Sequence, residues 1–523
     1  MHWQDGLVVA LYLAALVAIG LRTARRQTST ARYFVAERSI PGWAAGMSLL
    51  ATIITSVTFI AYPGAAYAGD WNLLVPGIMF VAVVALIGQV VIPFFRRAVS
   101  MSVYEYFGQR FGLPVRMYAS LAFALGHFSK MGFVFYLLAL SVTGITGWPI
   151  GGIILVLGLI TVLYTLIGGL EAVIWTDVLQ GFVLWSGIAV TILLLLFGSP
   201  CSSSQMLGAM IAQHKMALGS MHFDLSKPTF WTLCLYGFFF YLQKYTADQT
   251  VVQRYLAART DSQALRGINM GAWLCLPAWT AFMLIGSLLW AFYKLTGELL
   301  PATIVKSDQV FPHFMVTHMP IGLAGLFLAA LFGAAMSMLA SDLNCLAVIL
   351  TEDFYAQFFP SHSDERKLRV GKMSIGVCGL LAIGVAMRLA AMQGSALSVY
   401  YTITAIIAGG LAGLFLLAFL SRKAGRTAAV VGIVVNLIFT TWATLTMGGG
   451  HIVNLHQWNY PWHEYTIGAF GNILLFGAGL LAASFTRVQR SGATLWSWRE
   501  GRKLAGPETS QQGADDESHT QGA

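Results

Sequence analysis

The stretch LLATIITSVTFIAYPG, residues 49–64, decides the fold of this chain. It is apolar enough to enter a bilayer, yet four hydroxyl side chains lie in its middle and Pro63-Gly64 stands at its end. A closed helix satisfies its own backbone groups, whereas an unwound segment at membrane depth is tolerated only where it is buried in protein or lines a cavity. We therefore predict a broken membrane helix whose free backbone lines a binding site.

The whole chain has the composition of a multi-pass membrane protein. Of its 523 residues 57% are hydrophobic and 10% are charged, which is too apolar for a soluble protein of this size. A spanning helix needs about 20 mostly apolar residues, and thirteen segments meet this requirement. They are 4–21, 41–66, 73–95, 117–144, 150–168, 173–198, 230–249, 270–292, 311–351, 372–391, 395–420, 427–447 and 466–486. The block 311–351 is long enough for a short loop helix and a span that begins near Ile321.

The charges orient these spans. Most of the 31 Lys and Arg fall in alternate loops, and we assign Lys244 to Arg266 to one of the inward ones. The positive-inside rule then places the N-terminus outside and the C-terminus in the cytoplasm. Anionic lipid headgroups account for the net charge of +9, so no nucleic-acid partner is expected. We expect a plasma membrane protein, in a bacterium the inner membrane, with the first span retained and not cleaved as a signal.

The remaining segments exclude several protein classes. The five cysteines show neither a disulfide framework nor metal-ligand spacing. No hydrophilic insert is long enough for a soluble domain and no hydrolase or kinase motif is visible, so an enzyme is not expected. Residues 505–523 are polar without apolar periodicity and are predicted to be a disordered cytoplasmic tail.

A second interrupted segment lies five spans after the first. In FFFYLQKYTADQTVVQRYL, residues 238–256, polar and charged side chains interrupt an apolar helix. Interrupted segments at corresponding positions of two halves indicate a transporter built from inverted repeats. We predict an all-α polytopic fold divided as follows: 1–40 first helix and cytoplasmic loop, 41–198 repeat one, 199–229 extracellular loop, 230–420 repeat two, and 421–504 two accessory helices.

Hydroxyl groups suggest where ligands bind. Thr55, Ser56 and Thr58 crowd the predicted break, where unwinding frees carbonyls for a cation or a polar ligand. Ser337 and Ser341 are four residues apart and share a helix face. A structural alternative stays open for both groups, because Ser and Thr in a span also bond to their own carbonyls or sit in tight helix seams.

Two charged residues lie inside predicted spans. Asp177 stands about one turn into its helix, where it is a candidate for function or stabilises the helix N-terminus. Lys130 lies near the middle of a span and should face a wet cavity, an anionic ligand or an internal partner such as Asp177. His127, three residues earlier, is expected to pack or to form a hydrogen bond.

Five stretches together resemble the sodium:solute symporter family. They are SLLATIITSVTFIAYPG (48–64), MSVYEYFGQRFG (101–112), YTLIGGLEAVIWTDVLQG (164–181), DQTVVQRYLAARTDSQALRG (248–267) and MSMLASDLNCLAVILTEDFY (336–355). The resemblance implies the leucine-transporter-like fold, with five plus five helices in inverted repeat, one helix before them and two after. It also implies that Na⁺ is the transported coupling ion, carried in symport with a small organic solute.

The resemblance implies a sodium site between the broken helix and the eighth core helix. Its ligands would be the backbone oxygens of Ala51, Ile54 and Ala334 and the hydroxyl of Ser337. Where the family usually has another hydroxyl, this chain has Met338, whose soft thioether is a poor ligand for a hard cation.

The branch of the family that transports sialic acids suggests further residues. There a second sodium site would use Asp177 with Ser337 and Ser341, although Ala340 replaces another hydroxyl of that site. A basic residue at the position of Lys130 would face a substrate carboxylate. The full set of expected substrate contacts is Thr55, Ser56, Thr58, Phe59, Lys130, Tyr241 and Gln243.

The sequence therefore predicts sodium-coupled symport of an anionic carboxylate such as a sialic acid. A sugar symporter of the same fold is one alternative. A proton-coupled or uncoupled transporter is another, which Met338 and Ala340 favour. A transporter-like solute sensor and a channel complete the alternatives, and no obligate protein partner is evident.

Overall fold

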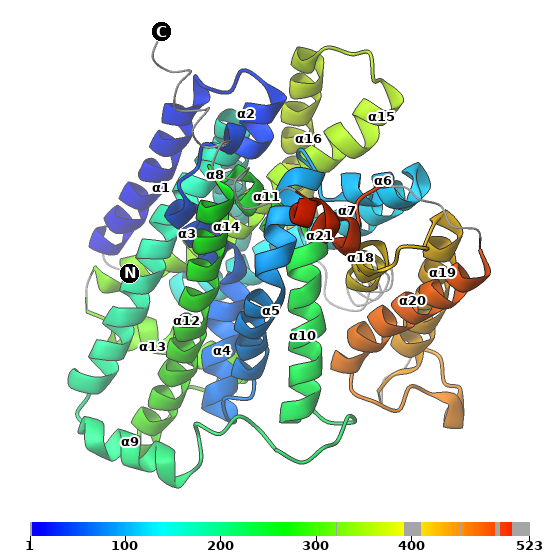
Figure 1. Ribbon diagram of the computed structural model, residues 1–523. Helices are drawn as coiled ribbons and strands as arrows, with labels where there is room; N and C mark the ends of the chain where they lie inside the picture. Colours follow the sequence, from blue (N-terminus) through cyan, green and yellow to red (C-terminus); the bar gives the residue numbers. More distant parts are fainter. Residues whose placement is uncertain are drawn as a thin grey trace.

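The computed structural model describes residues 3–302, 304–320, 322–391, 409–448, 452–486 and 492–504. Within these ranges the protein consists of helices and loops, and its β-type pairing is a single isolated bridge between Ile40 and Ala258. Nine of the described helices are long and apolar enough to cross a membrane, or ten if the bent pair α3–α4 forms one span. Figure 1 shows these helices side by side in one bundle.

The helices follow one another with short connections. Those of the first part are α1 (Trp3–Ala24), α2 (Thr30–Val35), α3 (Gly42–Ile53), α4 (Ser56–Ala68), α5 (Leu74–Ala98), α6 (Tyr104–Phe111), α7 (Leu113–Thr146), α8 (Ile150–Phe197) and α9 (Ser203–Ala212). Those of the second part are α10 (Phe230–Ala247), α11 (Gln249–Ala257), α12 (Asp261–Thr296), α13 (Val310–His318), α14 (Leu323–Val348), α15 (Ala356–Phe358), α16 (Asp364–Ala391), α18 (Leu411–Leu420), α19 (Arg426–Thr446), α20 (Tyr465–Phe485) and α21 (Leu495–Leu504).

Both predicted helix breaks are confirmed. Helix α3 ends at Ile53, Ile54 leaves the helical region (φ −80°, ψ 100°), and α4 continues at a bend of 60°. The side chain of Thr55 caps α4 by accepting a hydrogen bond from the Thr58 amide. At the second break Asp248 separates α10 from α11 and accepts a hydrogen bond from the Thr250 amide at 2.9 Å. Each break is thus capped by a side chain of its own segment.

The predicted boundary between the spans 150–168 and 173–198 falls at a sharp break in the structure. These spans form one element, α8, of 48 residues, which bends at Gly169 (φ 57°, ψ −157°). Only glycine adopts this conformation freely. The bend also needs a residue without a side chain, because a Cβ at position 169 would lie 2.7 Å from the Tyr33 carbonyl oxygen.

Other segments agree with the expected layout where the structure describes them. The block 311–351 contains the short helix α13 and then the span α14, as predicted. Of the predicted span 395–420, residues 395–408 lie outside the described residues, and α18 covers the end of that segment. The predicted disordered tail, 505–523, also lies outside them.

Helix α14 lies at the centre of the bundle. It is buried along most of its length and packs extensively against α8, while α12 packs against α3. The contact between α3 and α12 is close because small residues face each other: a Cβ at Gly267 would lie 2.0 Å from the Gly42 carbonyl oxygen. The first half of the broken helix is therefore held between α8, α12 and α14.

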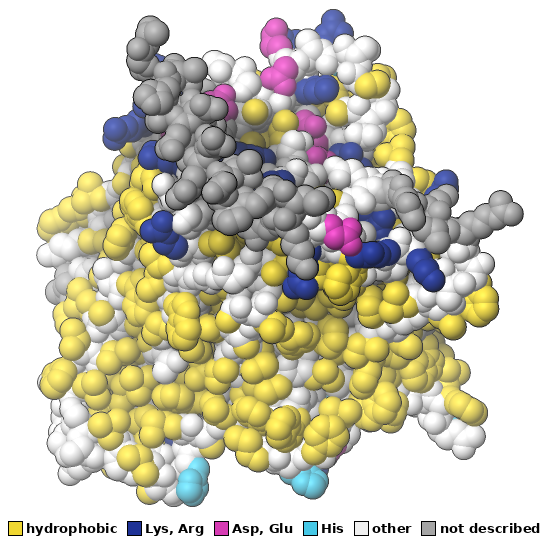
Figure 2. Space-filling model, viewed as in Figure 1, with side chains coloured by type: hydrophobic (Ala, Val, Ile, Leu, Met, Phe, Trp, Pro, Cys, Tyr) yellow, Lys and Arg dark blue, Asp and Glu magenta, His cyan; other side chains and the backbone are white. Residues whose placement is uncertain are grey.

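The distribution of charge fits a membrane belt with one basic end. On the face shown in Figure 2 a broad apolar band crosses the molecule, and Lys and Arg gather at the end that carries α2, α6 and α16. One part of the predicted inward charge was wrong. Arg254 is completely buried, because α11 lies inside the bundle with all its residues buried. Lys244, near the end of α10, is partly buried.

Gly169→Ala should destabilise the protein. The new methyl group would both clash with Tyr33 and force a side-chain-bearing residue to φ 57°, at a cost of about 1–3 kcal/mol. Thermal unfolding of the purified protein in detergent measures this. Gly384→Ala in α16 is the matched control, because a Cβ there meets nothing within 4 Å. Equal melting temperatures for the two variants would mean that the bend does not depend on glycine.

Candidate functional site

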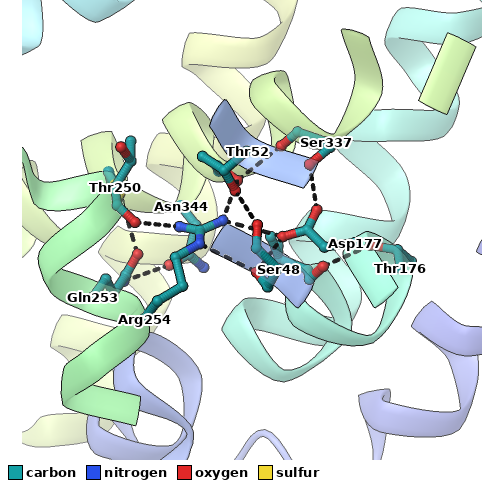
Figure 3. A network of polar contacts seen from close by, with 12 residues as sticks. Ser48, Thr52, Thr176, Asp177, Thr250, Gln253, Arg254, Ser337 and Asn344 are labelled. Carbon is teal, nitrogen blue, oxygen red and sulfur yellow. Dashed lines mark hydrogen bonds and ion pairs between the residues drawn. The ribbon is translucent and has the colours of Figure 1, made fainter. Parts of the chain in front are cut away.

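A buried carboxylate organises the polar centre of the bundle. Asp177 in α8 is completely buried, and its two oxygens accept hydrogen bonds from hydroxyl groups of two other helices (Figure 3). Ser337 of α14 donates to Oδ1 at 2.5 Å, and Ser48 of α3 donates to Oδ2 at 2.5 Å. Three core helices thus meet at one side chain.

Arg254 of α11 neutralises this carboxylate. Its Nη2 lies 3.2 Å from Asp177 Oδ2 and also donates to Ser341, while its Nε donates to Ser48 Oγ at 3.2 Å. Its Nη1 donates to the Thr250 carbonyl at 2.6 Å. A buried guanidinium is tolerated only when its charge is paired and its N–H groups have acceptors. Asp177 pairs the charge, and Ser48, Ser341 and the Thr250 carbonyl accept hydrogen bonds.

The candidate second sodium ligands lie together around this ion pair. Asp177 and Ser337 are in direct contact, and Ser341 donates to the Ser337 carbonyl at 2.8 Å. Thr52 of α3 lies 3.4 Å from the Ser341 hydroxyl. The oxygen cluster fits a cation by its chemistry, but the Arg254 guanidinium already supplies one positive charge to it.

The candidate ligands of the first sodium site lie on facing segments of α3 and α14. Ala51 and Ile54 are buried at the end of α3, and Ala334 and Ser337 are buried in α14. The last intrahelical bond of α3 joins the Ile54 amide to the Leu50 carbonyl at 2.9 Å. The carbonyls that follow have no donor within the helix, so they suit a cation. A hydroxyl that donates to Asp177, as that of Ser337 does, also keeps lone pairs for an ion.

The hydroxyls at the break differ in their hydrogen-bond partners. The Ser56 hydroxyl is buried and has no hydrogen-bond partner among the described residues. It lines a cavity of 540 Å³ between α4, α7 and α13. Thr55 and Thr58 are occupied with each other as cap and capped residue. Ser56 is thus the member of this group that is free to bind a solute.

The aromatic candidates pack inside the bundle. The ring of Phe59 contacts the rings of Phe282, Phe311 and Phe327, with centroids 4.9–5.8 Å apart. Tyr241 of α10 is buried against Phe80 at 4.6 Å. These contacts make both side chains part of the aromatic core in this conformation.

Gln243, also in α10, is only half-buried. It lies in the same helix as Tyr241 and one residue before Lys244. It lies five residues before Asp248, which marks the second helix break.

Lys130 pairs with an acid that the sequence analysis had not singled out. Its Nζ lies 3.3 Å from Asp342 Oδ2 in α14, and not against Asp177. Asp342 also contacts His127, whose Nδ1 lies 2.7 Å from Asp342 Oδ1. An acidic residue within a span is by default a functional candidate, so Asp342 in the stretch ASDLN could have been identified from the sequence. Arg254 was missed because it was counted with the loop charges.

Arg254→Gln should strongly destabilise the protein. The change leaves the Asp177 carboxylate buried without its cation, which costs about 3–5 kcal/mol and should lower the melting temperature clearly. Adding Asp177→Asn should restore part of the loss, because contacting residues are not additive. Arg266→Gln is the control, since Arg266 is exposed and its hydrogen bonds within the described residues go to Ser262. Additive losses in the double variant would contradict a direct pair.

Comparison with known proteins agrees with this geometry. The model of the sodium:solute symporter family matches residues 33–436. Over 440 residues the chain is 34% identical to the sodium/sialic acid symporter NanT of Aliivibrio fischeri, covering 82% of this chain and 86% of that protein. In structure it is similar to a substrate-bound outward-open Na⁺-coupled sialic acid symporter, with a TM-score of 0.87 and 30% identity over 94% of this chain and 100% of that one.

A more distant likeness concerns the fold alone. MHP1, a transporter of the nucleobase-cation-symport-1 family, aligns with a TM-score of 0.55 and 17% identity over 88% of this chain and 97% of its own. The resemblance that the five sequence stretches carried is confirmed by the family model. This chain belongs to the sodium:solute symporter family, and it is a multi-pass membrane transporter with sodium as its coupling ion, not an enzyme.

Proposed function

We propose that this chain carries out sodium-coupled symport of a sialic acid. Its similarity to sodium/sialic acid symporters over most of its length supports this substrate. The observation that carries the proposal is Lys130, whose side chain is 35% exposed although it lies near the middle of α7. An accessible ammonium at this depth suits the carboxylate of a small organic anion.

The solute site would combine Lys130 with the groups around the two breaks. Lys130 would bind the carboxylate, while hydroxyls of Thr55, Ser56 and Thr58 would bind the polar groups of the sugar ring. Ser56 is the most favourable of these hydroxyls, because it is buried and unpaired within the described residues. Phe59, Tyr241 and Gln243 would border the same site once α4 and α10 move apart from their present packing.

Sodium would couple the broken helix to α14. We assign the ion to the backbone oxygens of Ala51, Ile54 and Ala334 and to the Ser337 hydroxyl. Because these ligands come from two helices, the ion favours the state in which α3 and α14 lie close together. A solute that favours the same state is then bound more tightly in the presence of sodium, which is the condition for coupling.

Asp177, Ser337 and Ser341 are the candidate ligands of a second sodium ion. An ion there would share the carboxylate with Arg254, which already lies 3.2 Å from it. Sodium binding at this point would therefore require the guanidinium to shift toward its other acceptor, the Thr250 carbonyl.

We also propose the number of spans, their repeat and their orientation in the membrane. Two breaks at corresponding positions support inverted repeats over 41–198 and 230–420 within thirteen spans. The basic end in Figure 2 would face the cytoplasm of a bacterial cell, with the N-terminus outside and the C-terminus inside.

Uptake into liposomes that contain only this protein tests the transport function. An inward sodium gradient should drive accumulation of labelled N-acetylneuraminate, and choline in place of sodium should abolish it. Lys130→Gln should weaken solute binding about 10–100-fold, the value of a hydrogen bond to a charged group. Lys130→Arg should retain part of it. Lys294→Gln, at an exposed position of α12, is the matched control.

The other outcomes of this assay identify the alternatives. Accumulation of glucose, but not of N-acetylneuraminate, would indicate a sugar symporter. Accumulation driven by a proton gradient without sodium would indicate that coupling to sodium is lost at Met338. Binding without uptake would indicate a sensor.

Ser337→Ala should weaken sodium binding. In the unsubstituted protein sodium should raise the melting temperature, since a ligand at 100 times its dissociation constant stabilises the native state by about 2.7 kcal/mol. The variant should need a higher sodium concentration for the same rise. Potassium and choline at equal ionic strength are the controls, and equal stabilisation by all three salts would contradict a specific site.

A further inference from the structure

A second charged cluster lies beside the sodium ligands. It joins His127 and Lys130 of α7, Lys244 of α10, Asp248 at the second helix break and Asp342 of α14, and we call it the His127 cluster. Lys244 Nζ lies 2.5 Å from Asp248 Oδ2, and Lys130 Nζ lies 3.3 Å from Asp342 Oδ2. His127 stands between the two carboxylates. The cluster thus alternates cations and anions across three helices.

The His127 ring contacts a carboxylate on each side. Its Nδ1 lies 2.7 Å from Asp342 Oδ1, and its Nε2 lies 3.3 Å from Asp248 Oδ2. Stacking on Phe123, with ring centroids 3.9 Å apart, holds the plane of the imidazole. A neutral imidazole has one N–H, so one of its nitrogens would turn a lone pair toward a carboxylate oxygen. Only the imidazolium donates to both.

The net charge of the cluster depends on this proton. With a neutral His127 the two lysines balance the two aspartates, and with an imidazolium one positive charge remains. A solute carboxylate that binds Lys130 adds one negative charge. In a largely buried site an unbalanced charge is costly, so the bound anion is matched by the imidazolium form.

The contacts of Asp342 indicate which of its two cations can leave it when a solute binds. Its Oδ2 accepts no hydrogen bond from the described residues, although Lys130 lies within ion-pair distance of it. Lys130 is also the most exposed member of the cluster, at 35% against 12% for His127 and 1% for Asp342. Lys130 can therefore turn to a ligand, and the imidazolium is the cation that then remains on Asp342.

We propose that His127 is a proton site that is loaded when an anionic solute binds. This inference deepens the proposed function, because it rests on a solute carboxylate at Lys130. Before binding, Nδ1–H donates to Asp342 and the Nε2 lone pair faces Asp248. A proton from solvent then adds to Nε2, which donates to Asp248, and it leaves again when the solute departs.

Other titratable groups lie near this cluster, and the proposal assigns them no change of protonation. Arg254 of α11 is paired with Asp177, and the Tyr104 hydroxyl donates to the Ala247 carbonyl at 2.9 Å. The Cys345 thiol of α14 donates to Gln253 at 3.1 Å. All three have partners of their own outside the His127 cluster.

Calorimetry of the full-length protein tests the linkage. N-acetylneuraminate is titrated at constant sodium and at about pH 7.5, near the range in which histidine titrates, in buffers of different ionisation enthalpy. The measured enthalpy should depend on the buffer with the sign of proton uptake, by up to about one proton per solute. His127→Gln should remove this dependence. His222→Gln, at an exposed position, should keep it.

A measurement without solute separates the proton site from the choice of solute. The melting temperature of the unsubstituted protein should fall relative to that of His127→Gln as the pH is raised, because losing the proton removes one of two hydrogen bonds. Parallel pH profiles would overturn the proposal, as would solute binding with a buffer-independent enthalpy. If N-acetylneuraminate fails to bind while the profiles diverge, the proposed substrate is wrong and the proton site stands.

Discussion

The hydrocarbon of a membrane offers no hydrogen-bond partner, so every interruption of a helix must be answered by the protein itself. This constraint shapes the whole bundle. At both breaks a side chain of the same segment, Thr55 or Asp248, caps the amide end of the following helix. The carbonyl end before the first break stays without a helical donor, and it faces α14. These carbonyls are candidate ligands for a cation, because the apolar medium offers them no other partner.

The ion pair of Arg254 and Asp177 fixes how the core helices meet. Its partners come from α3, α8, α11 and α14, so the position of each helix depends on the same buried charges. A buried pair gains little net stability, because desolvation offsets the attraction. Its value lies in specificity: a displaced helix would leave a charge unpaired. The candidate sodium ligands lie on α3, α8 and α14, so an ion bound to them would bias this arrangement.

The two charged clusters share two helices. Helix α11 carries Asp248 at its start and Arg254 in its last turn, and α14 carries Ser341 and Asp342 side by side. Any rotation of α11 against α14 would therefore alter the candidate sodium ligands and the His127 cluster together. Coupling between ion and solute needs such an element, whose position both ligands bias. The bundle provides it in a helix of nine residues that is buried along its length.

The sequence by itself determined the class of the protein, both helix breaks and the family, because apolar length, interrupted hydroxyl-rich helices and five ordered motifs are local properties of the chain. It also identified Asp177, Ser337 and Lys130, since charged and hydroxyl groups within spans are visible by their position. Only the tertiary structure decided the partners. Arg254 and Asp177 are 77 residues apart and Lys130 and Asp342 even further, so no spacing could pair them. Pairing of buried charges follows from how helices pack, which sequence periodicity does not contain.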